Sequence, residues 1–463
     1  MGDTAMENGK RGYWLNQADI EWPDVDGVEN DEECDVAIVG GGLTGLWTAW
    51  ALKTADPKLS VHVYEAESFG YGASGRNGGW LSAKTVGIRS QLAKGPGGRH
   101  AVMEVDDQLR SGIDEIVDLL GRERINARKG GWLQVARSDS EQARIEHYVE
   151  KSRSWGVAEK DLRLLSATEA EEHVRISHTT GAIYSQHGYT VDPARMMCEL
   201  MMLAISAGVV LRAPARASEI GPGQLRVGRH TIRARWIVVA TEGYTARERG
   251  QRRAMLPLNS SLLVTEPLTP REWESIGWGG HAGASGSAHT YFYARPTVDR
   301  RIALGGRGKP YQFASSFDPS GKLDEGTVQA LLKVVHDLFP EIAAKPAHAW
   351  SGILGVHRDW SPTIAVDENA KILRVGGYAG SGVTAAYLAG KIAADIVLDR
   401  RTSLSRSPWV RQLPAKWEPE PLRWLGANAL YAIYGVADGV EARRGGAKTS
   451  SLALLADKLA RRG

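Results

Sequence analysis

A short apolar run that leads directly into a glycine-rich turn constrains the fold of this chain more than any other feature. Val36 to Val39 are consecutive apolar residues, which is typical of a strand buried on both faces of a parallel sheet. Gly40, Gly42 and Gly45 then form the pattern G-x-G-x-x-G. The first glycine permits a tight turn, the second lets a ligand approach the backbone, and the third lets the next helix pack on the strand.

The residues that follow complete a strand–helix–strand unit. A helix is expected from Leu43 to about Thr54, and the amides at its N-terminus would hold a diphosphate. A second strand over residues 60–64 leads into Glu65, where a carboxylate can bind ribose hydroxyls. No arginine closely follows Glu65, which favours FAD or NAD over NADP. An ordinary βαβ turn is the alternative, but the order of these parts predicts a dinucleotide site.

The composition of the 463 residues argues against several other classes of protein. Hydrophobic residues account for 43% and charged residues for 24%, which is typical of a soluble globular protein. The formal net charge is only +3, and no dense basic stripe precedes the C-terminal tail, so nucleic acid is not an expected partner. The sequence has no apolar run long enough for a transmembrane segment, no signal-peptide pattern and no cysteine pair with metal-ligand spacing. We therefore expect a cytoplasmic protein without a bound metal.

A second glycine-rich segment follows Glu65. Five glycines in the ten residues from Gly70 to Gly79 argue against a stable helix or a central strand. This composition predicts an ordered loop whose amides approach an anion or a flat ring. The alternative is a flexible linker, which Arg76, Asn77 and Trp80 disfavour because a linker has no need of them.

Two further segments carry candidate site residues. Residues 371–384 repeat the order of buried strand, glycine-rich turn and helix, but no second strand ending in an acid follows. The N-terminus of that helix suits negative charge, such as that of a reduced flavin. A hairpin is expected from strands at 290–295 and 301–307, which puts Tyr291, Tyr293 and Arg295 on one face. These side chains either line a substrate cavity or cover the sheet.

The two ends of the chain differ from its middle. Residues 1–33 are polar and acidic, and we expect an extension on the surface of the main body. Residues 401–463 contain an apolar helix over 422–440 and a basic end. Leu425, Ala429, Ile433 and Val436 recur at near-helical spacing, so we expect this stripe to be buried against the body or a second subunit. Contact with a membrane surface is the next alternative.

Three separated blocks resemble the D-amino-acid oxidase/glycine oxidase superfamily of FAD-dependent oxidoreductases, and within it the gamma-glutamylputrescine oxidase-like branch. The blocks are the unit from Gly40 to Glu65, the segment 72–79 and the turn 377–383. Residues 238–241 and 350–352 resemble the family more weakly, and the similarity covers roughly residues 30 to 400.

The resemblance implies a mixed α/β fold of the glutathione-reductase/D-amino-acid-oxidase type. A Rossmann-like FAD-binding domain would comprise residues 34–98, 177–250 and 350–400. An interleaved β-rich substrate domain would comprise residues 99–176 and 251–349. The N-terminal extension, 1–33, and a helical C-terminal arm, 401–463, lie outside both.

The motif and the resemblance together assign residues to the cofactor and the substrate. The cofactor residues are Gly40, Gly42, Leu43, Thr44, Gly45, Glu65, Ala66, Gly72, Ala73, Ser74, Arg76, Asn77, Gly78, Gly79, Trp80, Leu81, Ala217, Ala240, Thr241, Gly352, Gly380, Ser381, Gly382, Val383 and Thr384. The substrate residues are Trp80, Tyr291, Tyr293 and Arg307. No catalytic residue is assigned, because His187, His289 and His357 are scattered along the chain.

The resemblance also implies a reaction. Noncovalent FAD would take hydride at N5 from an amine or amino acid, water would hydrolyse the imine, and O2 would be reduced to H2O2. Relatives that react with oxygen carry a lysine on a strand resembling residues 301–307, where this chain has Ala303. A flavin dehydrogenase that reduces a carrier or quinone is therefore an alternative. A non-catalytic FAD-binding assembly protein is a third. A homodimer and a peripheral membrane contact through the C-terminal arm are the two alternative associations.

Overall fold

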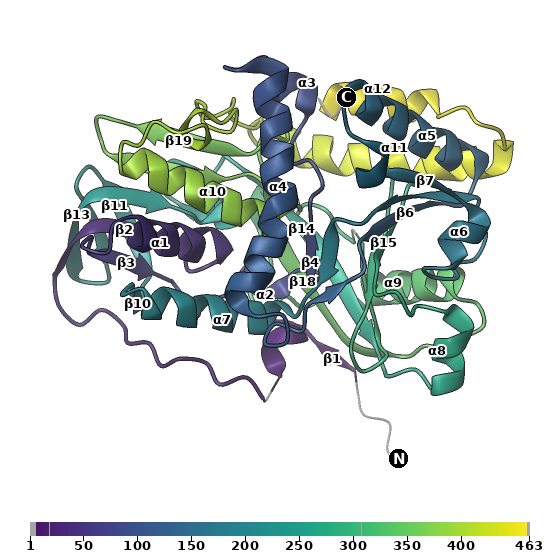
Figure 1. The fold of residues 1–463 in the computed structure, drawn as a ribbon, viewed down its shortest axis with the longest axis horizontal. Helices are drawn as coiled ribbons and strands as arrows, with labels where there is room; N and C mark the ends of the chain where they lie inside the picture. Colours follow the sequence, from purple (N-terminus) through teal and green to yellow (C-terminus); the bar gives the residue numbers. More distant parts are fainter. Residues whose placement is uncertain (1–5, 18, 307, 461–463) are drawn as a thin grey trace.

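The computed structural model describes residues 6–17, 19–306 and 308–460, and two large sheets organise this part of the chain (Figure 1). The first sheet has the strand order β10–β3–β2–β13–β12–β11, with β20 on β13 and β19 on β20. Its strands are β2 (Glu32–Val39), β3 (Val61–Tyr64), β10 (Val210–Arg212), β11 (Ala217–Gly221), β12 (Gln224–Val227), β13 (His230–Val239), β19 (Thr363–Asp367) and β20 (Ile372–Gly376). Strands β10, β3, β2, β13 and β20 pair in parallel, as a Rossmann-like domain requires.

Four long helices share one hydrophobic cluster with this sheet. They are α1 (Leu43–Ala55), α4 (Gly98–Leu120), α7 (Pro193–Ser206) and α10 (Gly382–Val397). Helices α1 and α10 approach closely at Gly390, where an added Cβ would lie 2.8 Å from the backbone nitrogen of Thr48. The predicted helix from Leu43 is confirmed. Helix α4 lies in the range assigned to the substrate domain but packs in this cluster, and the domain boundaries stay a prediction.

The second sheet has nine strands in the order β1–β18–β14–β17–β16–β15–β6–β8–β7. They are β1 (Glu7–Asn8), β6 (Trp132–Ala136), β7 (Arg163–Ser166), β8 (Gly181–Ser185), β14 (Leu256–Thr265), β15 (Gly283–Gly286), β16 (Tyr293–Pro296), β17 (Ile302–Gly306) and β18 (Pro346–Val356). The accompanying helices are α5 (Asp139–Ser154), α6 (Ala167–Glu171), α8 (Pro270–Ile276) and α9 (Glu325–Leu338). Most neighbouring strands are antiparallel, so this is the β-rich part of the fold.

The predicted hairpin is present as β16 and β17, but β16 begins at Tyr293 and not at Thr290. The amides of His289 and Thr290 donate to the carboxylate of Asp438, at 2.9 Å each, instead of to a neighbouring strand. Tyr291 therefore lies before the strand.

A short three-stranded sheet carries the second glycine-rich segment. It consists of β4 (Trp80–Ser82), β9 (Gly188–Thr190) and β5 (Arg128–Lys129). The segment is ordered, but the expectation that it contains no helix was wrong, because residues Ala73–Arg76 form the single turn α2. A side chain stabilises the turn, since the side-chain Nδ2 of Asn77 donates to the backbone carbonyls of Ala73 and Ser74 at 3.2 and 2.6 Å. Helix α3 (Arg89–Leu92) follows.

The N-terminal extension is not confined to the surface, which corrects the expectation for residues 1–33. Trp14 is only 2% exposed, and its indole N–H donates to the carbonyl of Asn77 at 2.9 Å. Its ring packs edge-on against Trp350 at 6.2 Å, and β1 pairs with β18. Trp14 is buried because it fills the space between the glycine-rich segment and the second sheet, whereas Tyr13 and Trp22 are half-buried around it.

The C-terminal arm forms two helices, α11 (Leu422–Arg444) and α12 (Ser451–Ala460), which contact each other near α5 (Figure 1). The arm packs on its own body, as expected, but through a different face from the predicted stripe. The inward side chains of α11 are Arg423, Ala427, Tyr434, Ala437 and Glu441. Leu425, Ala429 and Val436 are exposed and Ile433 is half-buried, so the predicted burial against the body was wrong for three of the four stripe residues. None of the helices in the described ranges combines the length and apolar character needed to cross a membrane.

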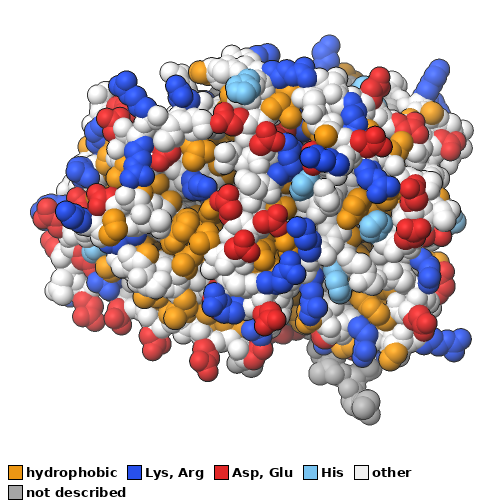
Figure 2. Space-filling model, in the orientation of Figure 1, with side chains coloured by type: hydrophobic (Ala, Val, Ile, Leu, Met, Phe, Trp, Pro, Cys, Tyr) orange, Lys and Arg blue, Asp and Glu red, His pale blue; other side chains and the backbone are white. Residues whose placement is uncertain are grey.

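Acidic and basic side chains are interspersed over the face of the molecule drawn in Figure 2. That face shows no continuous basic stripe.

Candidate functional site

The carboxyl ends of strands β2, β3 and β13 border a cavity of about 770 Å³, which we call the large cavity. Ligands of open parallel sheets bind at this edge of the strands. Most residues assigned to the cofactor line it, although they come from four separate parts of the chain. These residues are Gly40, Gly42, Leu43, Thr44, Glu65, Ala66, Gly72, Ala73, Ser74, Asn77, Ala217, Ala240, Thr241, Gly380, Gly382 and Val383.

A smaller cavity of about 280 Å³, the adjoining cavity, continues from one end of the large one. Both are lined by Ala73, Asn77, Leu354, Gly380 and Val383, so these residues mark the boundary between them. The other predicted residues that line the adjoining cavity are Arg76, Gly78, Trp80, Gly352, Ser381, Thr384, Tyr291 and Tyr293. Arg307 lies outside the described residues.

Three predicted cofactor residues line neither cavity and instead pack in the structure that surrounds the site. An added Cβ on Gly45 would lie 2.0 Å from the carbonyl oxygen of Gly40, so this glycine lets α1 approach β2. Gly79 has φ +71°, and its added Cβ would lie 2.4 Å from the carbonyl oxygen of Val191. Leu81 is buried in the hydrophobic cluster of the first sheet.

The N-terminus of α1 fits a diphosphate. Gly40 has φ +111°, and an added Cβ there would lie 2.6 Å from the carbonyl oxygen of Ala240. The helix has no side-chain hydrogen bond at its N-cap, Gly42, which lines the large cavity. The Ser74 hydroxyl accepts a hydrogen bond from the Leu43 amide at 2.9 Å and so fixes the glycine-rich segment to the helix. Backbone amides and the positive end of the helix dipole therefore face this part of the cavity.

Glu65 is held in place at the same end of the cavity. Its carboxylate accepts hydrogen bonds from the amides of Gly41 at 2.7 Å and Glu67 at 2.9 Å. Burial raises the pKa of Glu65, and these hydrogen bonds oppose the rise. Each carboxylate oxygen accepts more than one hydrogen bond, so the side chain retains capacity for ribose hydroxyls.

The turn before α10 is positioned by Glu242, which sequence reasoning missed. The buried carboxylate accepts hydrogen bonds from the amides of Gly377 at 2.8 Å and Tyr378 at 3.3 Å. Burial raises the pKa of Glu242 to about 7 despite these bonds. Glu242 begins the 3-10 helix η3 (Glu242–Arg247) after β13, and no sequence pattern links it to a turn so far along the chain.

Arg76 connects the glycine-rich segment to the second sheet at the edge of the adjoining cavity. Its guanidinium donates to the carbonyls of Pro319 at 2.9 Å and Ser351 at 3.3 Å, and lies 4.7 Å from the Tyr71 ring centre. Its Nε is buried without a hydrogen-bond partner in the described part of the chain.

Lys84 is the second site residue that sequence reasoning missed. It lines the adjoining cavity, and its Nζ lies 4.2 Å from the Trp132 ring centre and 5.8 Å from that of Trp80. Burial lowers the pKa of Lys84 to about 8. No Asp or Glu is among the described residues that line this cavity, so Lys84 has no acidic partner there. Its position four residues after Trp80 was the available sequence signal.

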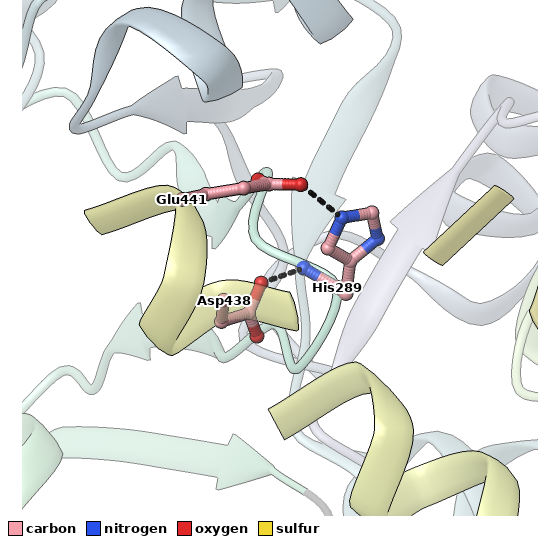
Figure 3. Close-up of side chains that lie close together, drawn as sticks. All are labelled: His289, Asp438 and Glu441. Carbon is pink, nitrogen blue, oxygen red and sulfur yellow. Dashed lines mark hydrogen bonds and ion pairs between the residues drawn. The ribbon is translucent and has the colours of Figure 1, made fainter. Parts of the chain in front are cut away.

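One His/Asp/Glu group among the described residues is close enough to hold a metal ion, and it lies outside both cavities. His289, Asp438 and Glu441 meet where the arm contacts the body (Figure 3). Arg144 donates to Glu441 at 2.5 Å, so a cationic side chain already pairs with this carboxylate. Burial acts to raise the pKa of Glu441, but hydrogen bonds from the Ser450 amide, Arg144 and His289 lower it to about 2. The group is therefore a contact between arm and body.

Comparisons with known proteins agree with this architecture. Residues 35–396 match the model of the DAO family, described as FAD dependent oxidoreductase. The gamma-glutamylputrescine oxidoreductase of Escherichia coli K12 is 29% identical over 373 residues, which is 79% of this chain and 83% of that protein.

Solved structures share the fold. Glycine oxidase from Geobacillus kaustophilus superposes with a TM-score of 0.68 at 22% identity, over 82% of this chain and 98% of that one. Iminodiacetate oxidase from Chelativorans sp. BNC1 superposes with a TM-score of 0.65 at 19% identity, over 82% of this chain and 100% of that one.

Proposed function

Because the family model matches residues 35–396, the chain belongs to the DAO family of FAD-dependent oxidoreductases, and we propose that it oxidises a C–N bond of an amine or amino acid. The observation that supports this most strongly is the continuity of the two cavities at Ala73, Asn77, Leu354, Gly380 and Val383. A dinucleotide in the large cavity would present one end to a ligand in the adjoining cavity. The proposed cofactor is noncovalent FAD.

The walls of the adjoining cavity suit such a substrate. Bound FAD would accept hydride at N5 from the carbon next to a neutral amine nitrogen. Trp80, Tyr291 and Tyr293 line the cavity and would exclude water around the amine. Desolvation disfavours the ammonium form, so these side chains would help to keep the amine neutral. The resulting imine would then be hydrolysed by water.

The charges of the adjoining cavity favour a substrate that also carries a carboxylate. Lys84 and Arg76 line the cavity, whereas no acidic residue in the described part of the chain does. A second ammonium group, as in a diamine, would meet two cations, but a carboxylate would neutralise Lys84. The glycine oxidase and the iminodiacetate oxidase with the same fold are named for carboxylate-bearing amines.

We propose O2 as the electron acceptor, with H2O2 as the product. A flavin dehydrogenase is the second candidate, because Ala303 is a buried residue packed among Trp14, Leu262 and Trp350 and offers no cation on β17. Lys84 is an amine that lines the adjoining cavity. A cytoplasmic location and a homodimer complete the proposal.

Anaerobic mixing of the holoprotein with amines and amino acids tests the reaction. We expect the flavin absorbance to bleach with a carboxylate-bearing amine and to recover in air with stoichiometric H2O2. Bleaching without reoxidation by air would support the dehydrogenase. No bleaching with any amine would contradict C–N oxidation and favour the assembly protein.

A further inference from the structure

The short C-terminal helix α12 exposes its larger apolar side chains and buries its smaller ones, which is the reverse of the usual arrangement for a helix in water. Ala453, Ala456 and Ala460 face inward and are 0%, 0% and 5% exposed. The four leucines face outward: Leu452, Leu454, Leu455 and Leu459 are 43–59% exposed. A helix that packs on a protein core from water normally buries leucine and exposes small or polar residues.

Helix α11 shows the same inversion. Its inward face contains Arg423 and Glu441, whereas Leu422, Leu425 and Val436 are 60%, 50% and 56% exposed. At 100° per residue, Leu425, Ala429 and Val436 lie opposite the inward face. These three residues of the apolar stripe that is visible in the sequence therefore point away from the body.

The charges of the two helices are separated by sign. Each acid of α11 and α12 is bound on the inner side: Asp438 to His289 and Thr290, Glu441 to Arg144 and His289, and Asp457 to Tyr434 at 2.7 Å (Figure 3). The exposed charged residues of the two helices and the loop between them are all basic. They are Arg443, Arg444, Lys448 and Lys458.

We propose that this outer face of the arm binds the surface of an anionic lipid bilayer. The outer face consists of the exposed apolar residues Leu422, Leu425, Val436, Leu452, Leu454, Leu455 and Leu459 with the basic residues Arg443, Arg444, Lys448 and Lys458. An amphipathic helix with leucines flanked by lysine and arginine lies in the interface, with its apolar side chains among the acyl chains and its cations at the headgroups.

Charge complementarity selects the bilayer over a second copy of this chain. A symmetric dimer through the outer face would bring two identical sets of cations together without exposed arm acids to pair with them. A bilayer that contains anionic lipid supplies the opposite charge over the whole face. The binding is peripheral, because the helices of the described chain do not meet the requirements of a membrane span.

The arm also lies beside the proposed site. The indole N–H of Trp360 donates to the carbonyl of Ala460, the last described residue of α12, at 3.0 Å. Trp360 lines a small cavity together with Ala379 and Ser381, which also line the adjoining cavity. A bilayer on the outer face would therefore be close to the site, and this geometry holds whichever electron acceptor is used.

Flotation of the full-length holoprotein with lipid vesicles tests the proposal. We expect the protein to float with vesicles of phosphatidylcholine containing phosphatidylglycerol, to bind at least tenfold less to pure phosphatidylcholine, and to be released partly by salt. The triple substitution Leu454→Ser, Leu455→Ser and Leu459→Ser should abolish flotation while the flavin spectrum and melting temperature stay unchanged. Substitution of Lys448 and Lys458 by Gln should weaken binding to the anionic vesicles alone.

The control is Met202→Ser with Ile205→Ser, two exposed apolar residues of α7 that are 50% and 38% exposed and lie outside the arm. This variant should float like the parent protein. If the parent protein does not float, or if the leucine variant floats equally well, the outer face is not a lipid-binding surface. A leucine variant that changes from dimer to monomer in light scattering, without any vesicle binding by the parent, would assign the face to a second copy.

Discussion

Replacement of Lys84 by methionine should stabilise the protein while weakening its ligand binding. Lys84 is a half-buried cation whose Nζ lies over Trp132, and none of the acidic residues that the structure describes lines its cavity. Burial lowers its pKa from 10.5 to about 8, which corresponds to a cost of at most about 3–4 kcal/mol in the free energy of folding at neutral pH. Methionine has a similar length and no charge, so Lys84→Met should recover part of this free energy.

The pH dependence of this gain has a definite sign. Below the folded-state pKa of about 8, Lys84 is charged in both states and the full cost applies. Between about 8 and 10.5 the unfolded chain binds more protons, so the stability of the parent protein rises with pH relative to that of Lys84→Met. The stability difference measured by urea unfolding should therefore shrink over this range. A variant that is less stable than the parent at pH 7 would refute the account of an uncompensated charge.

Ligand binding should change in the opposite direction. We would titrate the holoprotein with benzoate, a carboxylate without an amine, and follow the flavin absorbance. The charged fraction of Lys84 falls from about 90% at pH 7 to about 10% at pH 9, so the affinity of the parent should fall roughly tenfold. Lys84→Arg should bind equally well at both pH values because its side chain stays charged. Lys84→Met should bind weakly at both, and parent-like affinity in that variant would exclude Lys84 as the carboxylate partner.

Four other perturbations test the remaining parts of the site and fold. Glu65→Ala should weaken FAD retention by about 1–3 kcal/mol, measured by diafiltration, because charged hydrogen bonds are lost; unchanged retention would exclude Glu65 as the ribose ligand. Gly45→Ala should give mostly flavin-free protein by its absorbance ratio, because the Cβ would lie 2.0 Å from the Gly40 oxygen, and full flavin content would contradict this packing. Arg76→Ala should reduce turnover or FAD binding more than it lowers the melting temperature; the reverse pattern would make Arg76 purely structural. Deletion of residues 405–463 should cause aggregation in size-exclusion chromatography, because it removes the fully buried Trp409, and a soluble, active truncation would refute the packing role.

Local sequence was sufficient where neighbouring residues carry the whole interaction. The apolar run at 36–39, the glycines at 40, 42 and 45 and the acid at 65 predict the strand–helix–strand unit, because a tight turn and a helix N-terminus are made by residues close in sequence. The start of α7 is equally local, because Asp192 caps it by accepting hydrogen bonds from the amides of Ala194 and Arg195.

Local sequence was not sufficient where the partner comes from far along the chain. Lys84 reaches Trp132 only because β4 and β6 belong to sheets that lie next to each other, and Glu242 meets the amide of Gly377 across 135 residues. Trp14 lies in a segment that is polar in sequence, and only the structure shows that its indole N–H donates to the distant carbonyl of Asn77. Sequence patterns report periodicity and turn chemistry, but they carry no information about which distant segment is adjacent.

The C-terminal arm most clearly separates what local sequence determines from what the tertiary structure determines. The sequence by itself determined that Leu425, Ala429 and Val436 form an apolar stripe, because helical periodicity is a local property. Only the tertiary structure decided that the stripe faces outward, because Glu441 and Asp438 on the other side of α11 bind Arg144, His289 and Thr290. Buried charged groups require specific partners, whereas apolar side chains accept any apolar surface, so the ion pairs set the rotation of the helix.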